Sequence, residues 1–593
     1  MLTRLDALLK KYHAVGSWLL ILGAFIFYRG VLVCGFVYDD LEQLLQNPFV
    51  KNPHLWKRIF LGPVWSFAGS GAQISFYRPL HIFSYWLICR VAGFDTGAYH
   101  LSQLVLYAIS IWMVYRIGRM LLQNELAAFA GALLWTLHPL HVEAVTWISA
   151  NPDLGCALFC LLGFWFFLRA EDHSPANLRG HVVAAAVYFP ALFFKEAAFS
   201  FPLLLLAYWF CHSSAEPWFR RALHWLPYLA AVAVCAVIRV TVMGRFSDAP
   251  LFRKFRSRVA WGAVGLLGQH AKLFFWPLHL SGFRDFDLAA SVRSPWPWVA
   301  LAVLAAACVW RHHEPRLSFL GLWWGVTLVP CLDYRHLSFP LVADRFSYLP
   351  SVGLCLALGY LAFGWLPRHI PQAGQGEVAA VTLTAVAALW AVQIVRTIPH
   401  WQNNDALFDY SLRASPNAAL VHVTHGVRLQ FRERDYEGAA REFQTALRLN
   451  AQSFRPLPVV TYNSYIGLGQ VAQLQGREPE AIEYFTKAVH LMRDFYVAYD
   501  MLGSIYFPRQ DYARAAEYFK AAVSADPQDV QGRFYLGTCW MKLGKPAQAA
   551  EQFHAAREVD PDYFQAYVAE AGALELAGDK AGAARVRSEM TSK

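Results

Sequence analysis

Residues 14–40, AVGSWLLILGAFIFYRGVLVCGFVYDD, begin as an apolar run and end in two adjacent carboxylates. The run over residues 14–35 is long enough to cross a bilayer, because a spanning helix needs about 20 apolar residues. Carboxylates beside a membrane are energetically expensive and mark functional sites. Asp39 and Asp40, where the chain first leaves the membrane, are therefore the first candidate functional residues.

The composition of the whole chain also indicates a membrane protein. Of its 593 residues, 56% are hydrophobic and 16% are charged, against about 25% charged in soluble domains. Charged residues become dense after Arg396, which predicts a membrane domain over residues 1–398 and a water-soluble domain over residues 399–593. The net charge of +10 does not indicate nucleic-acid binding, since basic residues in membrane proteins mostly mark the cytoplasmic ends of spans. The ten cysteines have no metal-ligand spacing, so we interpret them as core or lipid-facing residues.

Eleven apolar stretches are predicted to cross the membrane. Two more, 74–94 and 259–281, are ambiguous, and the positive-inside rule favours helices that lie in the interface or re-enter without crossing. This topology puts the Asp39-Asp40 loop and the C-terminal domain on the outer side. Five cations between Met243 and Arg258 then also lie outside, which indicates either an anionic ligand or a long loop that escapes the rule. The predicted spans are residues 14–35, 99–121, 126–143, 153–169, 180–195, 197–215, 222–242, 294–310, 317–333, 346–366 and 377–397.

The C-terminal domain carries a 34-residue repeat. A pattern of Leu-Gly, Ala, Phe, Ala and Pro in residues 502–527 recurs in residues 536–561 and runs back to residues 468–488. This period and these residue types are the tetratricopeptide signature, in which small residues let paired helices pack around a Phe. A degenerate repeat from Tyr436 precedes the array, and residues 562–587 are predicted to cap it. Such solenoids present a concave surface to peptides or partner proteins.

Polar residues gather at the ends of several spans that this topology places on the outer side. The set contains both carboxylates and cations, a mixture that suits a base deprotonating a nucleophile while cations hold a phosphate leaving group. The candidates are Asp39, Asp40, Arg78, His138, His141, Glu143, Lys195, Glu196, Asp344 and Arg345.

Some of these candidates have a purely structural explanation as well. Lys195 and Glu196 could form an ion pair that caps two short spans, and Arg78 could only anchor an interfacial helix. His138 and His141, at i,i+3 spacing beside a glutamate, could hold a metal ion. Two histidines alone are weak evidence, so no protein metal site is predicted. Paired acids at a membrane exit have the weakest structural explanation.

Seven short motifs occur in an order that a known family shares. In chain order they are Phe36-x-Tyr38-Asp39-Asp40, Tyr77-Arg78-Pro79-Leu80, Tyr99-His100, His138-Pro139-x-His141-x-Glu143-Ala144 with Asp153, Lys195-Glu196, Trp276-Pro277-Leu278-x-Leu280-Ser281 and Arg345-x-x-Tyr348-Leu349-Pro350. Together they resemble the membrane half of the transmembrane and tetratricopeptide-repeat-containing O-mannosyltransferases (the TMTC family) and their bacterial relatives. The resemblance extends along essentially the whole chain, repeats included.

The resemblance implies a GT-C fold, an all-α glycosyltransferase whose donor is a sugar on a polyprenyl phosphate. By it, Asp39 or Asp40 would be the catalytic base. Two positions depart mildly from the family pattern, Asp344 where Glu is usual and Asn151 where Arg is usual, and they leave the identity of the sugar open. The residues carried over to the donor phosphate are Arg78, His138, Lys195 and Arg345.

These features together predict an enzyme with about eleven membrane helices followed by a tetratricopeptide solenoid. It would move a mannose-like sugar from a polyprenyl-phosphate donor to Ser or Thr of exported proteins presented by the repeats. Its site and repeats would face the periplasm or the lumen of the endoplasmic reticulum. The alternatives are a GT-C enzyme acting on a lipid or glycan, and a non-enzymatic membrane-anchored scaffold. The expected partners are the bilayer, the donor and an acceptor protein but no nucleic acid, and no residue pattern supports a divalent metal cofactor.

Overall fold

The computed structural model describes residues 2–66, 76–173, 177–212, 218–244, 257–278, 280–333, 340–370 and 374–591. Within these ranges the chain is helical and contains no strand, which confirms the all-α prediction. Packing divides it into two compact units, residues 1–64 with 75–416 and residues 65–74 with 417–593. Helix α20 (Asn404–Ala414) groups with the first unit. The domain boundary after residue 398 stays a prediction from charge density.

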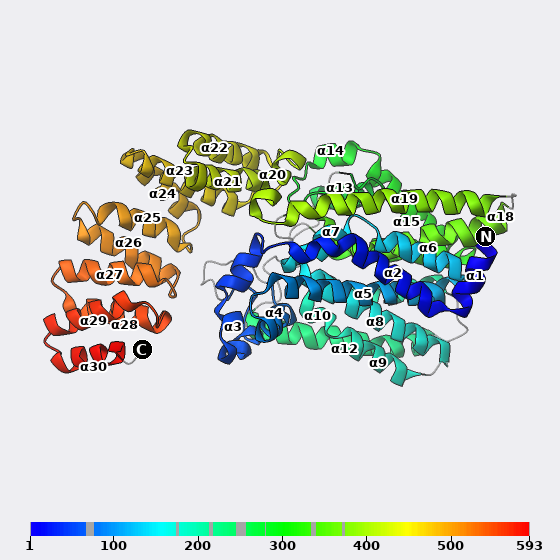
Figure 1. Ribbon diagram of the computed structural model, residues 1–593, viewed down its shortest axis with the longest axis horizontal. Helices are drawn as coiled ribbons and strands as arrows, with labels where there is room; N and C mark the ends of the chain where they lie inside the picture. The colour runs from blue at the N-terminus through cyan, green and yellow to red at the C-terminus, as the bar shows by residue number, and fades with distance from the viewer. Residues whose placement is uncertain are drawn as a thin grey trace. The chain divides into compact units, whose positions relative to one another are not determined.

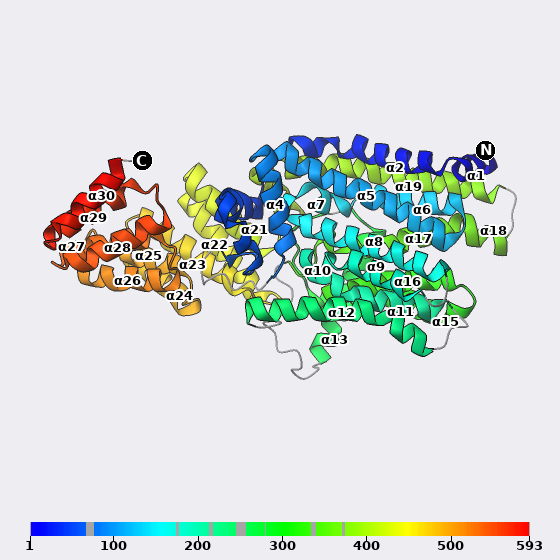
Figure 2. The ribbon, with the colours of Figure 1, turned by 90° about the horizontal axis from the view of Figure 1, so that it is seen from below.

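Six helical segments of the first unit, among the described residues, are long and apolar enough to cross a membrane. The long helices run side by side (Figure 1; Figure 2). Helix α5 (Thr96–Leu122) packs between α2 (His13–Tyr28) and α8 (Asn151–His173), and α2 also packs on α19 (Gln375–Thr397). The chain is a membrane protein, while the count of eleven spans stays a prediction. The six segments are Ala14–Val33, Thr96–Leu122, Ile148–Asp172, Arg221–Met243, Ser351–His369 and Gln375–Trp401.

Four stretches expected as single helices are interrupted or begin later than predicted. Proline lacks the N–H that continues a helix, and Pro139, Pro190 and Pro350 lie at three of the breaks. The helices within the predicted spans 126–143, 180–195, 197–215 and 346–366 therefore have other bounds than those stretches, and their crossing of the membrane stays a prediction. The breaks matter because they place polar candidates in irregular backbone. The observed elements are α6 (Glu125–Thr136), α7 (His141–Thr146), α9 (Leu178–Tyr188), α10 (Ala191–Phe194), η6 (Glu196–Ser200), α11 (Phe201–Cys211), η8 (Asp344–Ser347) and α17 (Ser351–Tyr360).

Two further helices occupy the ambiguous apolar stretches. Helix α13 (Ser257–Phe275) packs on α15 (Trp296–Val309) and α16 (Pro315–Leu332). Helix α4 (Pro79–Ala92) packs on α3 (Pro48–Lys51). Their assignment as helices that do not cross the membrane stays a prediction. The other elements are α1 (Leu2–Lys11), η1 (Arg29–Val33), η2 (Leu41–Gln46), η3 (Pro53–Phe60), η5 (Ile148–Ala150), α12 (Trp218–Met243), α14 (Leu288–Arg293), η7 (Trp310–His312), η9 (Leu361–Trp365), α18 (Leu366–His369) and η10 (Ile398–Trp401).

Two smaller predictions have different outcomes. Nine of the ten cysteines are buried and Cys308 is exposed, as expected for core and lipid-facing positions. The cationic loop between Met243 and Arg258 falls largely on residues 245–256, which lie outside the described residues.

The second unit is a series of antiparallel helix pairs, which confirms the tetratricopeptide prediction. Each helix packs on the next along the chain. The helices are α21 (Ala419–Arg428) with η11 (Leu429–Glu433), α22 (Tyr436–Gln452), α23 (Pro458–Leu474), α24 (Glu478–Leu491), α25 (Tyr496–Tyr506), α26 (Tyr512–Ala525), α27 (Val530–Lys542), α28 (Pro546–Val559), α29 (Phe564–Leu576) and α30 (Lys580–Thr591).

The repeat glycines are explained by a contact inside each pair. A Cβ atom on Gly503 would lie 2.8 Å from the ring of Phe519, too close for two carbon atoms without displacement. The first helix of the pair therefore approaches the second only because this position has no side chain. The same contact joins Gly426 with Phe443, Gly469 with Phe485 and Gly537 with Phe553.

Candidate active site

The first loop holds its two acids on a strained turn. Tyr38 has a φ of +50°, in the left-handed region that costs a residue with a side chain about 1–2 kcal/mol. Contacts far along the chain hold it there, since its N–H donates to Asn404 Oδ1 at 2.8 Å and its ring packs edge-on against Phe283 and Phe408. Strain of this kind persists where the surrounding structure over-determines it, often at functional sites.

Asp40 is fully buried and anchors the loop. Its Oδ2 accepts a hydrogen bond from the Val37 N–H at 3.0 Å. Its Oδ1 accepts from the Ser149 N–H at 2.8 Å and the Ser149 hydroxyl at 2.5 Å. Burial raises the pKa of Asp40 to about 7, although the hydrogen bonds from Ser149 and Val37 oppose that rise. The geometry makes Asp40 a positioning residue that ties the first loop to η5.

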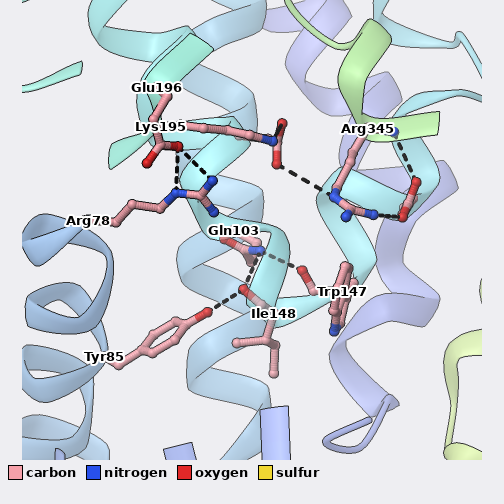
Figure 3. A network of polar contacts seen from close by, with 10 residues as sticks. Arg78, Tyr85, Gln103, Trp147, Ile148, Lys195, Glu196 and Arg345 are labelled. Carbon is pink, nitrogen blue, oxygen red and sulfur yellow. Dashed lines mark hydrogen bonds and ion pairs between the residues drawn. The ribbon is translucent and has the colours of Figure 1, made fainter. Parts of the chain in front are cut away.

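The segment that receives Asp40 is itself held by two helices. The Tyr85 hydroxyl of α4 donates to Ile148 O at 2.7 Å, and Gln103 Nε2 of α5 donates to Trp147 O at 3.1 Å, as Figure 3 shows. Asn151 Nδ2 donates in turn to Gln103 Oε1 at 3.1 Å. Asn151, one of the two departures from the family pattern, thus supports the segment on which Asp40 depends.

Asp39 has a different environment from its neighbour. It is partly exposed, and among the described residues no donor makes a hydrogen bond to its carboxylate. The surrounding protein keeps water from its carboxyl group and thereby raises the pKa of Asp39 to about 7, with Glu42 and Asp40 adding to the rise and Arg345 opposing it. A carboxylate without a hydrogen-bond partner and with a pKa near neutrality is suited to general-base chemistry.

A network of ion pairs lies beside these acids. The Arg345 guanidinium pairs with Glu143 and lies 3.9 Å from Asp153 Oδ2. Lys195 Nζ lies 2.5 Å from the other oxygen of Asp153, so Asp153 joins the two cations. Both cations also lie over the ring of Phe346, at 4.8 Å for Lys195 and 5.1 Å for Arg345. Figure 3 shows the side chains of Lys195 and Arg345 converging from separate elements.

A second pair of cations shares Glu196. Arg78 donates to Glu196 Oε2 through Nε at 2.9 Å and NH2 at 2.7 Å, and Arg239 NH1 lies 3.0 Å from Oε1. Burial acts to raise the pKa of Glu196, but the two guanidinium groups outweigh it and lower that pKa to about 2. Lys195 and Glu196 therefore do not pair with each other, and each belongs to a different ion pair.

Asp344 and Arg345 are adjacent in sequence but also have different partners. Asp344 accepts from Arg284 NH2 at 2.7 Å and from the Ser281 N–H at 3.1 Å. Burial raises the pKa of Asp344 and Arg284 opposes that rise. Asp344 thus holds the segment of residues 281–284 in place. The Arg345 side chain pairs with Glu143 and Asp153 instead.

The structure places the two candidate histidines in packing contacts. His138 is fully buried, with Nε2 3.2 Å from Phe274 O and Nδ1 accepting from the Leu140 N–H. His141 contacts the Tyr107 hydroxyl and the Ser351 hydroxyl through its two nitrogens. All four ring nitrogens therefore have partners within the protein. The structure does not bring these rings together with the ion pairs, and their role at a donor stays a prediction.

Three site residues were not among the sequence candidates. Arg239 lies inside a predicted span, where an ionisable side chain by itself indicates function, so this signal was present. Asp153 belonged to a quoted motif but had no assigned role. Asn404 could not be found from sequence, because its contact with Tyr38 joins residues 366 positions apart.

Comparison with known proteins places the chain among relatives with related membrane and repeat parts. The family model described as dolichyl-phosphate-mannose-protein mannosyltransferase matches residues 78–243. Tetratricopeptide repeat models match residues 426–493 and 509–584. The two kinds of match fall in the two units of the structure.

Curated relatives support the same assignment. A protein O-mannosyl-transferase of Caenorhabditis elegans is 24% identical over 67% of this chain and 58% of its own length. Tmtc1 of Drosophila melanogaster is 24% identical over 70% of this chain and 59% of its own, and TMTC3 of Homo sapiens is 22% identical over 78% and 54%. The chain thus spans little more than half the length of these relatives. The resemblance to the TMTC family that the motifs predicted is confirmed.

Proposed function

We propose that this chain, a relative of the TMTC O-mannosyltransferases, is a membrane glycosyltransferase that transfers a mannose-like sugar from a polyprenyl-phosphate donor to Ser or Thr of an exported protein. The observation that carries the proposal is the position of Asp39. Its carboxylate has no hydrogen-bond partner in the described structure, a pKa of about 7, and an arginine nearby that itself contacts Asp153. A base and cations for a leaving group are thus close together.

The proposed step is a single displacement at the sugar. Asp39 removes the proton from the acceptor hydroxyl as its oxygen attacks the anomeric carbon. The bond from that carbon to the donor phosphate oxygen breaks, and the polyprenyl phosphate leaves with the bonding electrons. Arg345 and Lys195 stabilise the negative charge that develops on that phosphate, since charge-assisted contacts are about twice as strong as neutral ones.

The ion pairs balance the charge of Lys195 and Arg345 before a donor binds. Each is paired with a carboxylate and about nine-tenths buried, with 13% of the Arg345 and 12% of the Lys195 side chain exposed. Pairing keeps buried charges from being left alone, which would be strongly destabilising. A phosphate would therefore share the cations with Asp153 and Glu143. Arg78 and Arg239, which share Glu196, form a second group of cations.

The repeats are proposed to present the acceptor, with the site and the repeats on the same periplasmic or luminal side of the membrane. Tetratricopeptide arrays bind extended peptides along a concave surface. A lipid or glycan acceptor would have no need of such an array, and a scaffold would leave the acids and cations of the first unit without a use.

The test is a transfer assay with the full-length protein in liposomes. It uses radiolabelled mannosyl polyprenyl phosphate and acceptor protein from the same cell, with the product linkage identified by mass spectrometry. Lys195→Gln and Arg345→Gln should raise the KM for the donor more than the KM for the acceptor. Arg311→Gln, a cation outside the network, is the matched control and should leave both unchanged. Absence of transfer by the wild-type protein, or equal effects on both substrates, would contradict the proposal.

A further inference from the structure

A second group of polar side chains lies at the other end of α8. Glu171 of α8, His181 of α9 and His224 of α12 bring a carboxylate oxygen and two ring nitrogens within 4.8 Å of one another. Asp153 of the ion-pair network is also on α8, and the 18 residues from it to Glu171 correspond to about 27 Å at 1.5 Å per residue. The group is therefore separate from the candidate active site.

These side chains come from three helices that pack together. Helix α9 contacts both α8 and α12, and the three lie side by side in Figure 1. His181 and His224 are 1% and 3% exposed, and Glu171 keeps 22% of its side chain exposed. Ionisable side chains among membrane helices are rare and mark functional sites.

The distance between His181 and Glu171 suits two ligands of one ion. His181 Nε2 lies 3.3 Å from Glu171 Oε1. Two ligand atoms about 2.05 Å from a tetrahedral ion are about 3.3 Å apart. The rings of His181 and His224 are stacked with centroids 4.4 Å apart and planes inclined by 19°. Because an imidazole binds a metal along its ring plane, the His224 ring would turn out of this stacked arrangement to aim its nitrogen at an ion shared with His181.

Tyr228 supplies a partner for the remaining nitrogen of His181. Its hydroxyl lies 3.3 Å from His181 Nδ1. In the tautomer whose Nδ1–H donates to this hydroxyl, the lone pair of Nε2 points toward the Glu171 carboxylate and is available to a cation. Histidine ligands of metal ions commonly donate their other N–H in this way, which fixes that tautomer.

We propose that Glu171, His181 and His224 bind a divalent transition-metal ion of the zinc class. Imidazole nitrogen and carboxylate oxygen are ligands that zinc prefers, and three protein ligands leave one position for water. Since each ligand lies on a different helix, the ion joins α8, α9 and α12 at the end of the bundle remote from Asp39. This site is distinct from the His138 and His141 pair, whose nitrogens are occupied.

The test measures metal binding by the full-length protein, purified in detergent through a tag without histidine. After chelation and dialysis, Zn²⁺ is added and the protein-bound metal is measured by mass spectrometry, and Co²⁺ is added in parallel for its visible absorption. One high-affinity equivalent is expected. His181→Gln and His224→Gln should lose it. Tyr228→Phe should keep it with affinity lowered by about 10- to 100-fold.

The same measurement of bound Zn²⁺ gives the control and the results that would overturn the proposal. His212→Gln changes another histidine, which contacts Tyr208 O at the end of α11, and should bind one equivalent like wild type. Glu171→Gln keeps the side-chain volume and repeats the test if a histidine variant does not fold. Wild-type protein that binds no Zn²⁺ overturns the proposal. So does a Glu171→Gln or His224→Gln variant that binds Zn²⁺ as tightly as wild type, because the polar contacts are then only a Glu-His-Tyr hydrogen-bond chain.

Discussion

Replacing each acid of the first loop with asparagine should separate catalysis from stability. Asp39→Asn removes the proposed base at nearly constant volume, and loss of a general base lowers rates by about 100- to 10,000-fold. The structure assigns no hydrogen bond to the Asp39 carboxylate within its described residues, so no hydrogen bond is lost. The variant should be folded, should insert into membranes and should bind donor, but its kcat should fall by that factor.

Asp40→Asn should show the opposite balance. The carboxylate accepts three hydrogen bonds at 2.5–3.0 Å from Val37 and Ser149. An amide presents one oxygen and one NH2 group, so at least one buried donor would lose its acceptor, at about 1–3 kcal/mol. The loop should loosen, the free energy of unfolding should fall by that amount, and part of the activity should remain.

The pH dependence gives an independent check on Asp39. A base with a pKa of about 7 is protonated below that pH, so kcat should rise as pH increases through about 7. Because the folded pKa lies above the ordinary 3.8, the native state holds the proton more tightly than the unfolded state. Stability of wild type relative to Asp39→Asn should therefore fall between pH 4 and 7 and stay constant above.

The assay combines transfer kinetics with thermal unfolding of the same preparations. Glu42→Gln is the matched control: it removes a neighbouring carboxylate whose charge only helps to raise the pKa of Asp39, so it should keep kcat above pH 7 and shift the pH profile to lower pH. Near-normal kcat in Asp39→Asn would refute the assignment of the base. If Asp39→Asn is strongly destabilised and Asp40→Asn is stable, the interpretation that Asp40 anchors the first loop is refuted.

The remaining predictions concern the repeats and the topology. Gly503→Ala should destabilise the second unit by about 1–3 kcal/mol, because its Cβ would lie 2.8 Å from Phe519. Gly572→Ala, where nothing lies within 4 Å, should leave stability unchanged or raise it, and equal melting temperatures of the two variants would contradict this packing. In a Cys308→Ser background, Lys57→Cys and Gln528→Cys should both react with a membrane-impermeant thiol reagent from outside. Protection of Gln528→Cys until the membrane is broken would show that the repeats do not share a side with the first loop.

Local pattern was enough to predict the class of each part of the chain. Apolar runs such as residues 14–35 depend only on composition over about 20 residues, and the repeat depends only on a period of 34. Most of the site residues were also predicted, because each lies in a short continuous motif that can be recognised without knowledge of the structure. The prolines in these stretches indicate where the helices are interrupted. The spans were predicted from the number of apolar residues alone, which does not take proline into account.

Tertiary structure decided which residue does what within that set. Asp344 and Arg345 are neighbours, yet one pairs with Arg284 and the other with Glu143, 202 positions away. The sequence does not distinguish Asp39 from Asp40. In the structure the contacts with Ser149 make Asp40 the anchor of the loop, while the Asp39 carboxylate has no hydrogen-bond partner among the described residues. Composition and period are properties of a short segment, whereas the partner of a charge depends on which distant segment folds against it.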